Sequence, residues 1–289
     1  MKKKIIYLLF IFVILFGVSG CIKDDVMQDI DIVTTIYPIE YITKRLYDDN
    51  SNIVSVYPRG VVPKDYKLTD KKLHDFSNRD LFIYNGSSYE KEYAKDMLSY
   101  NNKLKIIDAS YGIDSTNKDS DVWLNPANVL MVAQNIRNEL SLYISSSVVI
   151  DDINNKYNLF KVDITEFETE VKKAADNSSY ATIVSYDESL NFLEKYGFKV
   201  INLVDNNKIK QTNVDLAKKL YEEDKLSYIF VIENEKIKDE ISNLIKEYDV
   251  EQLTINSLEN ISEEAMKNND DFLSLMHHNL DLVKKETYK

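Results

Sequence analysis

The 289-residue chain is poor in the residues that build compact catalytic and metal sites. It has one Cys and three His, which excludes an internal disulfide and a cysteine-cluster zinc site. Its six Gly form neither of the common glycine patterns that hold nucleotide phosphates. No Ser-His-Asp or Cys-His set is supported, because no His falls near an expected strand end and the single Cys lies in the N-terminal signal described below. We therefore predict that the chain is not an enzyme.

Positive charge is also scarce, because 36 Lys and Arg stand against 48 Asp and Glu, for a formal net charge of −12. Binding to nucleic acid needs clustered basic side chains that neutralise phosphates, so nucleic acid is excluded as a partner. Apolar residues, by contrast, are abundant and make up 44 % of the chain. A chain of this length and composition folds as one large domain or two ordinary ones.

The N-terminus has the pattern of a secretion signal. Lysines at positions 2–4 precede an unbroken apolar run at 5–16, which is shorter than the ~20 residues that span a bilayer. The run ends in Val18-Ser19-Gly20-Cys21, which resembles the lipobox of bacterial lipoproteins. The alternative is an ordinary signal peptide with a chance Cys. We predict a signal peptide at 1–20, a diacylated Cys21 and an acidic tether at 21–31, which place the protein on the extracytoplasmic face of the cell membrane.

From residue 32 onward, short β-rich runs alternate with amphipathic helical stretches, a pattern typical of an α/β fold with parallel strands. We expect a first lobe at 32–149 and a second lobe at 176–289. The expected strands are Ile32–Thr35, Ile53–Pro58, Leu81–Tyr84, Lys105–Asp108, Ala181–Val184, Lys199–Leu203, Tyr228–Ile232 and Gln252–Ile255. The expected helices are Pro38–Leu46, Thr69–Phe76, Ser88–Leu98, Pro126–Leu140, Asp187–Lys195, Asn213–Glu223, Glu235–Tyr248 and Asp271–Lys285.

Between the two halves, residues 150–175 contain neither Gly nor Pro. Apolar residues recur there at spacings of three and four, namely Tyr157, Phe160, Ile164, Phe167 and Val171. This spacing predicts one long amphipathic helix of about 39 Å. The predicted fold class is therefore α/β, with two Rossmann-like lobes of mainly parallel strands joined by one long helix.

Ligands of open α/β sheets bind beyond the carboxyl ends of the strands. Four expected loops lie there: Arg59–Lys67, Ala109–Val122, Ser185–Glu188 and Asn256–Glu259. Two lobes on one stiff helix would bring these loops together as a clamp with a cleft between its arms.

Several segments then resemble one family in the order in which they occur. They are Val33–Ile39, Pro58–Tyr66, Asp80–Gly86, Asp121–Pro126 and Asp271–Leu280. Together with the lipobox, they are similar to the metal-binding lipoproteins of bacterial zinc and manganese ABC importers, the cluster A-I solute-binding proteins. The resemblance implies a monomeric receptor that delivers Zn²⁺ or Mn²⁺ as cargo to a membrane permease powered by an ATPase. Because Trp123 matches a packing position of the family, the resemblance also predicts that this residue lies in the core.

Members of the family bind their metal between the lobes with four side chains, mostly His. By resemblance these positions fall on Lys64, Asp121, Tyr186 and Asn256, the last fixed only to within one or two residues. Zinc prefers deprotonated nitrogen, sulfur or carboxylate donors, and of the four only Asp121 is a good one. A Tyr must ionise from a pKa near 10, an Asn offers a carbonyl oxygen, and a Lys ammonium repels a cation.

Three alternatives remain for the cleft. Asp65, Asp187 and Glu188 would give an all-oxygen site suited to manganese or magnesium. Lys64 would instead replace the metal and pair with Asp121, with Tyr186 and Asn256 as neutral hydrogen-bond partners. In the third alternative, all four side chains face solvent. The corresponding alternative function is a non-transport surface lipoprotein that acts in adhesion, sensing or modulation of a transporter and binds no metal.

Overall fold

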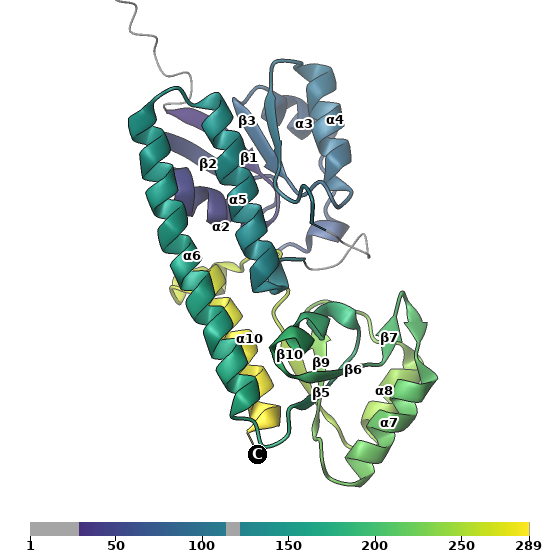
Figure 1. Cartoon of the computed structure of the whole chain (residues 1–289). Helices are drawn as coiled ribbons and strands as arrows, with labels where there is room; N and C mark the ends of the chain where they lie inside the picture. Colours follow the sequence, from purple (N-terminus) through teal and green to yellow (C-terminus); the bar gives the residue numbers. More distant parts are fainter. Residues whose placement is uncertain (1–28, 114–121, 289) are drawn as a thin grey trace, which may run out of the picture.

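The computed structural model describes residues 29–113 and 122–288, which form two lobes beside one long helix (Figure 1). The first lobe, in purple and blue, carries the N-terminal half, and the second, in green, carries most of the C-terminal half. The predicted signal peptide, Cys21 and Asp121 lie outside the described residues.

The first lobe is built on a four-stranded parallel sheet with the order β2-β1-β3-β4. Ile32 at its centre pairs with Ile53 on one side and Leu81 on the other. Its strands are β1 (Ile30–Thr34), β2 (Ser51–Ser55), β3 (Leu81–Tyr84) and β4 (Lys105–Asp108). Its α-helices are α2 (Tyr37–Tyr47), α3 (Asp70–Ser77), α4 (Glu90–Tyr100) and α5 (Pro126–Tyr143), with short 3₁₀ turns at Asp48–Asn50, Pro63–Asp65 and Val122–Leu124.

The second lobe repeats the plan with a parallel sheet in the order β10-β9-β5-β6 and a separate β7–β8 hairpin. Its strands are β5 (Thr182–Ser185), β6 (Lys199–Asn202), β7 (Val204–Asp205), β8 (Lys208–Ile209), β9 (Tyr228–Ile232) and β10 (Glu251–Ile255). Its helices are a 3₁₀ helix at Glu188–Tyr196, α7 (Gln211–Glu222), α8 (Asp239–Glu247) and α9 (Glu263–Lys267), and α10 (Phe272–Thr287) closes the chain.

Helix α6 (Ser147–Asp176) is 30 residues long and runs beside both lobes, with α10 packed along its second half (Figure 1). Ser146 caps its first turn by accepting a hydrogen bond from the Val149 N–H. The five apolar residues that predicted this helix are all buried on one stripe of it. At 1.5 Å per residue the helix is about 45 Å long, enough to support two sheets.

The two-lobed α/β architecture with a linking helix is confirmed, and several boundaries differ from expectation. Strand β1 begins at Ile30, inside the predicted tether, because the Ile30 side chain is buried. Strand β2 ends at Ser55 rather than Pro58, since the Ser55 hydroxyl donates to Thr35 O at 2.6 Å and accepts from the Tyr57 N–H. The β7–β8 hairpin and α9 were not expected from the sequence.

Two helices of the second lobe also differ. The stretch after β5 is a 3₁₀ helix that ends at Tyr196, and the next residue, Gly197, has a left-handed φ of 107°. The helix expected from Glu235 begins only at Asp239, because the Lys238 N–H is held by the Tyr186 hydroxyl and Asn234 adopts a φ of 62°. None of the helices in the described ranges combines the length and the apolar composition that a membrane span requires.

Candidate functional site: the cleft between the lobes

A cavity of about 720 Å³ opens between the lobes, where loops at the carboxyl ends of both sheets face each other. First-lobe loops after β2 and β3 line one side, and second-lobe loops after β5, β9 and β10 line the other. The carboxyl groups that line it are those of Glu90, Asp187, Glu188, Glu233, Glu235 and Glu259. Among the described lining residues, Lys64 alone is basic. The cleft is therefore an acidic, oxygen-rich space of a size suited to a small ligand.

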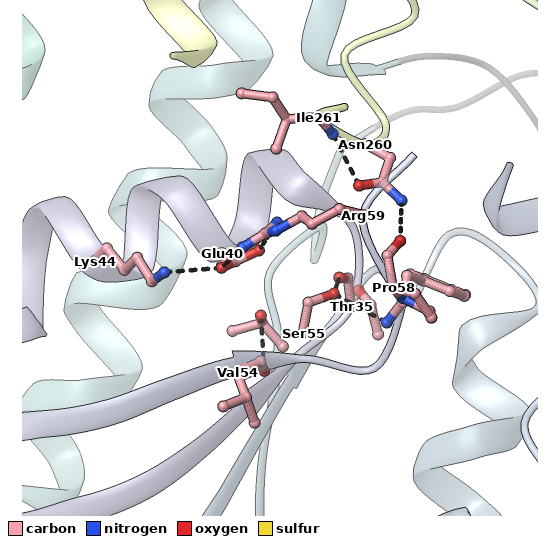
Figure 2. Close-up of polar contacts among 11 residues, drawn as sticks. Thr35, Glu40, Lys44, Val54, Ser55, Pro58, Arg59, Asn260 and Ile261 are labelled. Atoms are coloured by element: carbon pink, nitrogen blue, oxygen red, sulfur yellow. Dashed lines mark hydrogen bonds and ion pairs between the residues drawn. The ribbon is translucent and has the colours of Figure 1, made fainter. Parts of the chain in front are cut away.

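The loop after β2 is anchored from behind by a buried ion pair (Figure 2). Arg59 donates to both carboxylate oxygens of Glu40 on α2, at 2.6 and 2.5 Å, and Lys44 lies 2.9 Å from the same group. The Glu40 side chain is 1 % exposed. Burial alone would raise the pKa of Glu40, but the hydrogen bonds from Arg59 and Lys44 outweigh it and hold that pKa below its usual value. The loop that carries Lys64 is thus fixed at its first residues.

A segment of the second lobe is bonded directly to this loop. Asn260 donates from Nδ2 to Pro58 O at 2.8 Å and to Val61 O at 2.9 Å, and Figure 2 shows its amide above Pro58. The Gly60 N–H donates to Ile261 O at 3.2 Å. At its other end, the segment accepts a hydrogen bond of 2.7 Å at Ser257 O from Trp123 Nε1. The lobes are therefore joined at the cleft as well as through α6.

Lys64 points into this cleft and meets the second lobe. Its ammonium lies 3.6 Å from a carboxylate oxygen of Glu235, and the two side chains are 54 % and 35 % exposed. Such an exposed pair contributes at most about 1 kcal/mol. Pairing of Lys64 with Asp121 stays a prediction, because Asp121 lies outside the described residues.

Tyr186 lines the cavity, but its hydroxyl is engaged within its own lobe. It donates to Lys236 O at 3.1 Å and accepts from the Lys238 N–H at 3.2 Å. Burial is the main cause that raises the pKa of this phenol. A neutral phenol that makes two hydrogen bonds stabilises the loop after β9 and is a poor ligand for a metal cation.

Asn256 does not line the cavity in this structure. Its Oδ1 accepts from the Leu258 N–H at 2.8 Å, and its backbone exchanges two hydrogen bonds with the Asn279 side chain on α10. Ser257 and Glu259 line the cleft instead, within three residues of the predicted position. The turn at Asn256 thus aims the following residues toward the cleft.

The proposed substitute donors are only partly brought together. Asp187 and Glu188 line the cavity, with Asp187 accepting from the Ser189 N–H, whereas Asp65 is exposed and outside the lining. Within the described ranges, no three His, Cys, Asp or Glu side chains converge as a metal would require. The sequence also missed Glu90, a fully buried carboxyl that lines the cleft.

Trp123 is 5 % exposed, which confirms its place in the core, and it also reaches the cleft.

The family model described as zinc-uptake complex component A, periplasmic (ZnuA), matches residues 32–286. The chain belongs to the ZnuA family.

Curated relatives share this family assignment at low identity. The zinc-binding lipoprotein AdcA of Streptococcus pneumoniae is 26 % identical over 318 residues, which cover 99 % of this chain. The match spans only 61 % of AdcA, so this chain corresponds to a part of that relative. The high-affinity zinc uptake system protein ZnuA of Bacillus subtilis is 24 % identical, over 88 % of this chain and 86 % of the relative.

Solved structures agree on the fold. The metal-dependent lipoprotein YcdH of Bacillus subtilis superposes with a TM-score of 0.74 at 20 % identity, covering 90 % of this chain and 100 % of that one. The laminin binding protein Lmb of Streptococcus agalactiae, described as a bifunctional protein with adhesin and metal transporting activity, gives 0.72 at 18 % identity and covers 89 % and 99 %. At these identities the likeness establishes the fold alone.

Proposed function

We propose that this chain is the extracytoplasmic substrate-binding lipoprotein of an ABC importer of the zinc-uptake type. The observation that carries the proposal is an acidic cavity of about 720 Å³ between the lobes of a chain that belongs to the ZnuA family. Its partners would be a membrane permease with its ATPase and the membrane itself, and its state would be monomeric. It binds and delivers a ligand and performs no chemistry on it.

The nature of the cargo follows from the donors. The names of the relatives make zinc the first expectation, and the resemblance adds manganese. A Lys ammonium, a neutral phenol and an Asn amide at three of the four family positions do not supply a tetrahedral zinc set. We therefore propose that the cleft lacks a high-affinity zinc site of the family type.

A second candidate is a non-transport surface lipoprotein that keeps the fold without a metal. The Lys64–Glu235 contact favours it, because the ammonium of one lobe lies against a carboxylate that the other lobe would otherwise offer to a cation. Adhesion, sensing and modulation of a transporter all suit such a protein.

The cargo is tested by melting the protein with increasing Zn²⁺ or Mn²⁺. A ligand present at a hundred times its Kd stabilises a native protein by about 2.7 kcal/mol. For a chain of this size that raises the melting midpoint by roughly 5–10 °C. We expect no saturable rise with either metal. A saturable rise that Asp121→Ala abolishes would contradict the metal-free cleft and restore a metal importer.

Transport itself is tested in liposomes that hold the permease and ATPase of a zinc-type importer from the same cell. Docking of the lipoprotein is expected to raise ATP hydrolysis above that of the transporter alone. Unchanged hydrolysis, together with no metal-induced stabilisation, would favour the non-transport candidate.

The anchor is tested separately with Cys21→Ala. If Cys21 carries the lipid, the variant should accumulate as uncleaved precursor and lose labelling by a fatty-acid analogue. A diacyl anchor supplies two chains, which is enough for stable attachment where one chain is marginal. Unchanged labelling would exclude Cys21 as the anchor.

A further inference from the structure

A buried carboxyl group lies beneath the loop that carries Lys64. Glu90, the first residue of α4, is 1 % exposed and lines the cleft. Its Oε2 accepts from the Asn85 N–H at 3.0 Å, and its Oε1 lies 3.0 Å from the Tyr57 hydroxyl. No Lys, Arg or His of the described chain forms an ion pair with it. A carboxylate buried without a cation is costly, so a proton on Glu90 relieves this site.

From Glu90, a series of contacts leads to the Lys64 loop. The Tyr57 hydroxyl lies 2.9 Å from the Tyr89 hydroxyl, and the Tyr89 hydroxyl donates to Pro63 O at 2.7 Å. Pro63 directly precedes Lys64, whose ammonium meets Glu235 of the second lobe. The Glu90 carboxyl is therefore connected through two phenols to the backbone that positions the basic residue of the cleft.

Counting protons along this series shows what the carboxyl contributes. Three oxygen–oxygen contacts join Glu90, Tyr57, Tyr89 and Pro63, but the two phenols supply only two protons. With Glu90 ionised, Tyr57 donates either to Glu90 or to Tyr89, and one contact has no hydrogen. With Glu90 protonated, Glu90 donates to Tyr57, Tyr57 to Tyr89 and Tyr89 to Pro63 O, so all three hydrogen bonds form.

The surroundings agree with a protonated Glu90. Burial raises its pKa, the Asn85 N–H and the Tyr57 hydroxyl partly offset this, and the Glu259 charge raises it again, to about 7. Burial also raises the pKa values of Tyr57 and Tyr89, which keeps both phenols as donors.

The groups that face this cluster come from five segments. Thr35 follows β1, Tyr57 follows β2, Asn85 follows β3, Tyr89 and Tyr93 belong to the start of α4, and Glu259 follows β10. Of these, only Glu259 carries a charge at neutral pH.

We propose that protonated Glu90 is a positioning residue for the loop at 58–66, and that it fixes Lys64 at the cleft through Tyr57, Tyr89 and Pro63. Loss of the proton removes one link and loosens the loop, so the contact between Lys64 and Glu235 weakens as the pH rises. The proposal does not depend on which cargo the cleft takes, or on whether the protein transports at all.

The test is a nitroxide label on the exposed loop position next to Lys64. In the full chain carrying Cys21→Ser, Asp65→Cys provides the only thiol, and its mobility is followed by electron spin resonance from pH 5 to 9. We expect an immobile label at low pH that becomes mobile with a midpoint near pH 7. A matched label at Ser99→Cys, at the far end of α4, should show no transition, which separates the loop from any global effect of pH.

Three variants decide the mechanism. Glu90→Gln places an amide N–H where the carboxyl proton would be, so the label should stay immobile at every pH. Tyr89→Phe, at a position 39 % exposed, should leave the label mobile at every pH without disturbing the fold. Glu259→Gln should keep the transition and move its midpoint to lower pH. A transition that survives in Glu90→Gln, or a label whose mobility is independent of pH in the unaltered loop, would overturn the proposal.

Discussion

The two lobes share one sheet plan but treat the loops at its carboxyl edge differently. In the first lobe, buried polar groups hold these loops: Glu40 binds Arg59 behind the Lys64 loop, and Glu90 lies beneath it. In the second lobe, the acidic residues after β9 and β5 are partly or fully exposed, and Tyr186 bonds only backbone of its own lobe. In the first lobe, buried polar groups therefore hold the loops of the cleft in place, while the second lobe supplies negative charge to the cleft.

Breaking the buried pair of Arg59 and Glu40 should have the largest effect on stability. Arg59→Met leaves the buried Glu40 carboxylate with only Lys44, and disruption of a buried pair costs about 3 kcal/mol or more of unfolding free energy. The control is Arg79→Met, whose pair with Asp31 is exposed on both sides, at 42 % and 40 %, and should cost at most about 1 kcal/mol. Equal losses, measured by urea unfolding, would mean that the Glu40 pair does not hold the loop.

The Glu40–Arg59 pair should also make the stability of the protein depend on pH. Because the folded pKa of Glu40 lies below its usual value of 4.5, this stabilisation is present above about pH 4.5 and is lost as the pH falls through the folded pKa. In acid, the unfolding free energy of Arg59→Met should therefore approach that of the unaltered protein.

Glu90 should act in the opposite direction. Its pKa rises from 4.5 to about 7 on folding, so its stabilisation is complete below pH 4.5, declines as the pH rises and is gone above about pH 7. One pKa unit corresponds to about 1.4 kcal/mol, so the unaltered protein should lose about 3 kcal/mol relative to Glu90→Gln over this range. Unfolding midpoints of the two proteins at several pH values measure the difference, and parallel curves would exclude a proton on Glu90.

A smaller effect is expected where β3 ends. A Cβ on Gly86 would lie 2.0 Å from the Asp108 carboxylate, which accepts from the Gly86 N–H, so Gly86→Ala should cost about 2 kcal/mol. In the second lobe, Gly197 has room for a Cβ but a φ of 107°, so Gly197→Ala should be destabilising through backbone strain. Adding Asp108→Ala should relieve the first variant and leave the second unchanged. Relief of both would show that crowding does not distinguish the two sites.

The smallest effect is expected across the cleft itself. A double-mutant cycle with Lys64→Met and Glu235→Gln should give a coupling below about 1 kcal/mol that decreases at high salt, because both side chains are exposed. A coupling above ~1.5 kcal/mol that survives salt would mean that a buried bridge holds the lobes together. The same cycle with Asp121→Asn in place of Glu235→Gln tests the pair expected from the sequence.

The sequence predicted the sheets better than the cleft, for a physical reason. The bounds of β3 and β9 follow from continuous apolar runs, those of β4 from an Ile pair between Lys105 and Asp108, and the stripe on α6 from helical periodicity. Partners from distant segments leave no such local signal. Glu235 as the partner of Lys64, and Asn260 as the group that holds Pro58, are separated from those residues by about 170 and 200 positions. Glu90 carried one signal, an acidic residue near the start of the helix that follows the buried strand β3.

The hydrogen bonds between residues 58–61 and 260–261 also constrain the order in which a nascent chain becomes native. The first sheet can pair as soon as residue 108 has been synthesised, since all of its strands precede that point. The Tyr37 N–H at the start of α2 waits for Glu259 O, and Pro58 O and Val61 O wait for Asn260. Contacts so distant in sequence form late. We infer that a chain released before residue 256 would retain the first sheet while the loop of Lys64 stayed incomplete, exposing it to proteases that the finished protein resists.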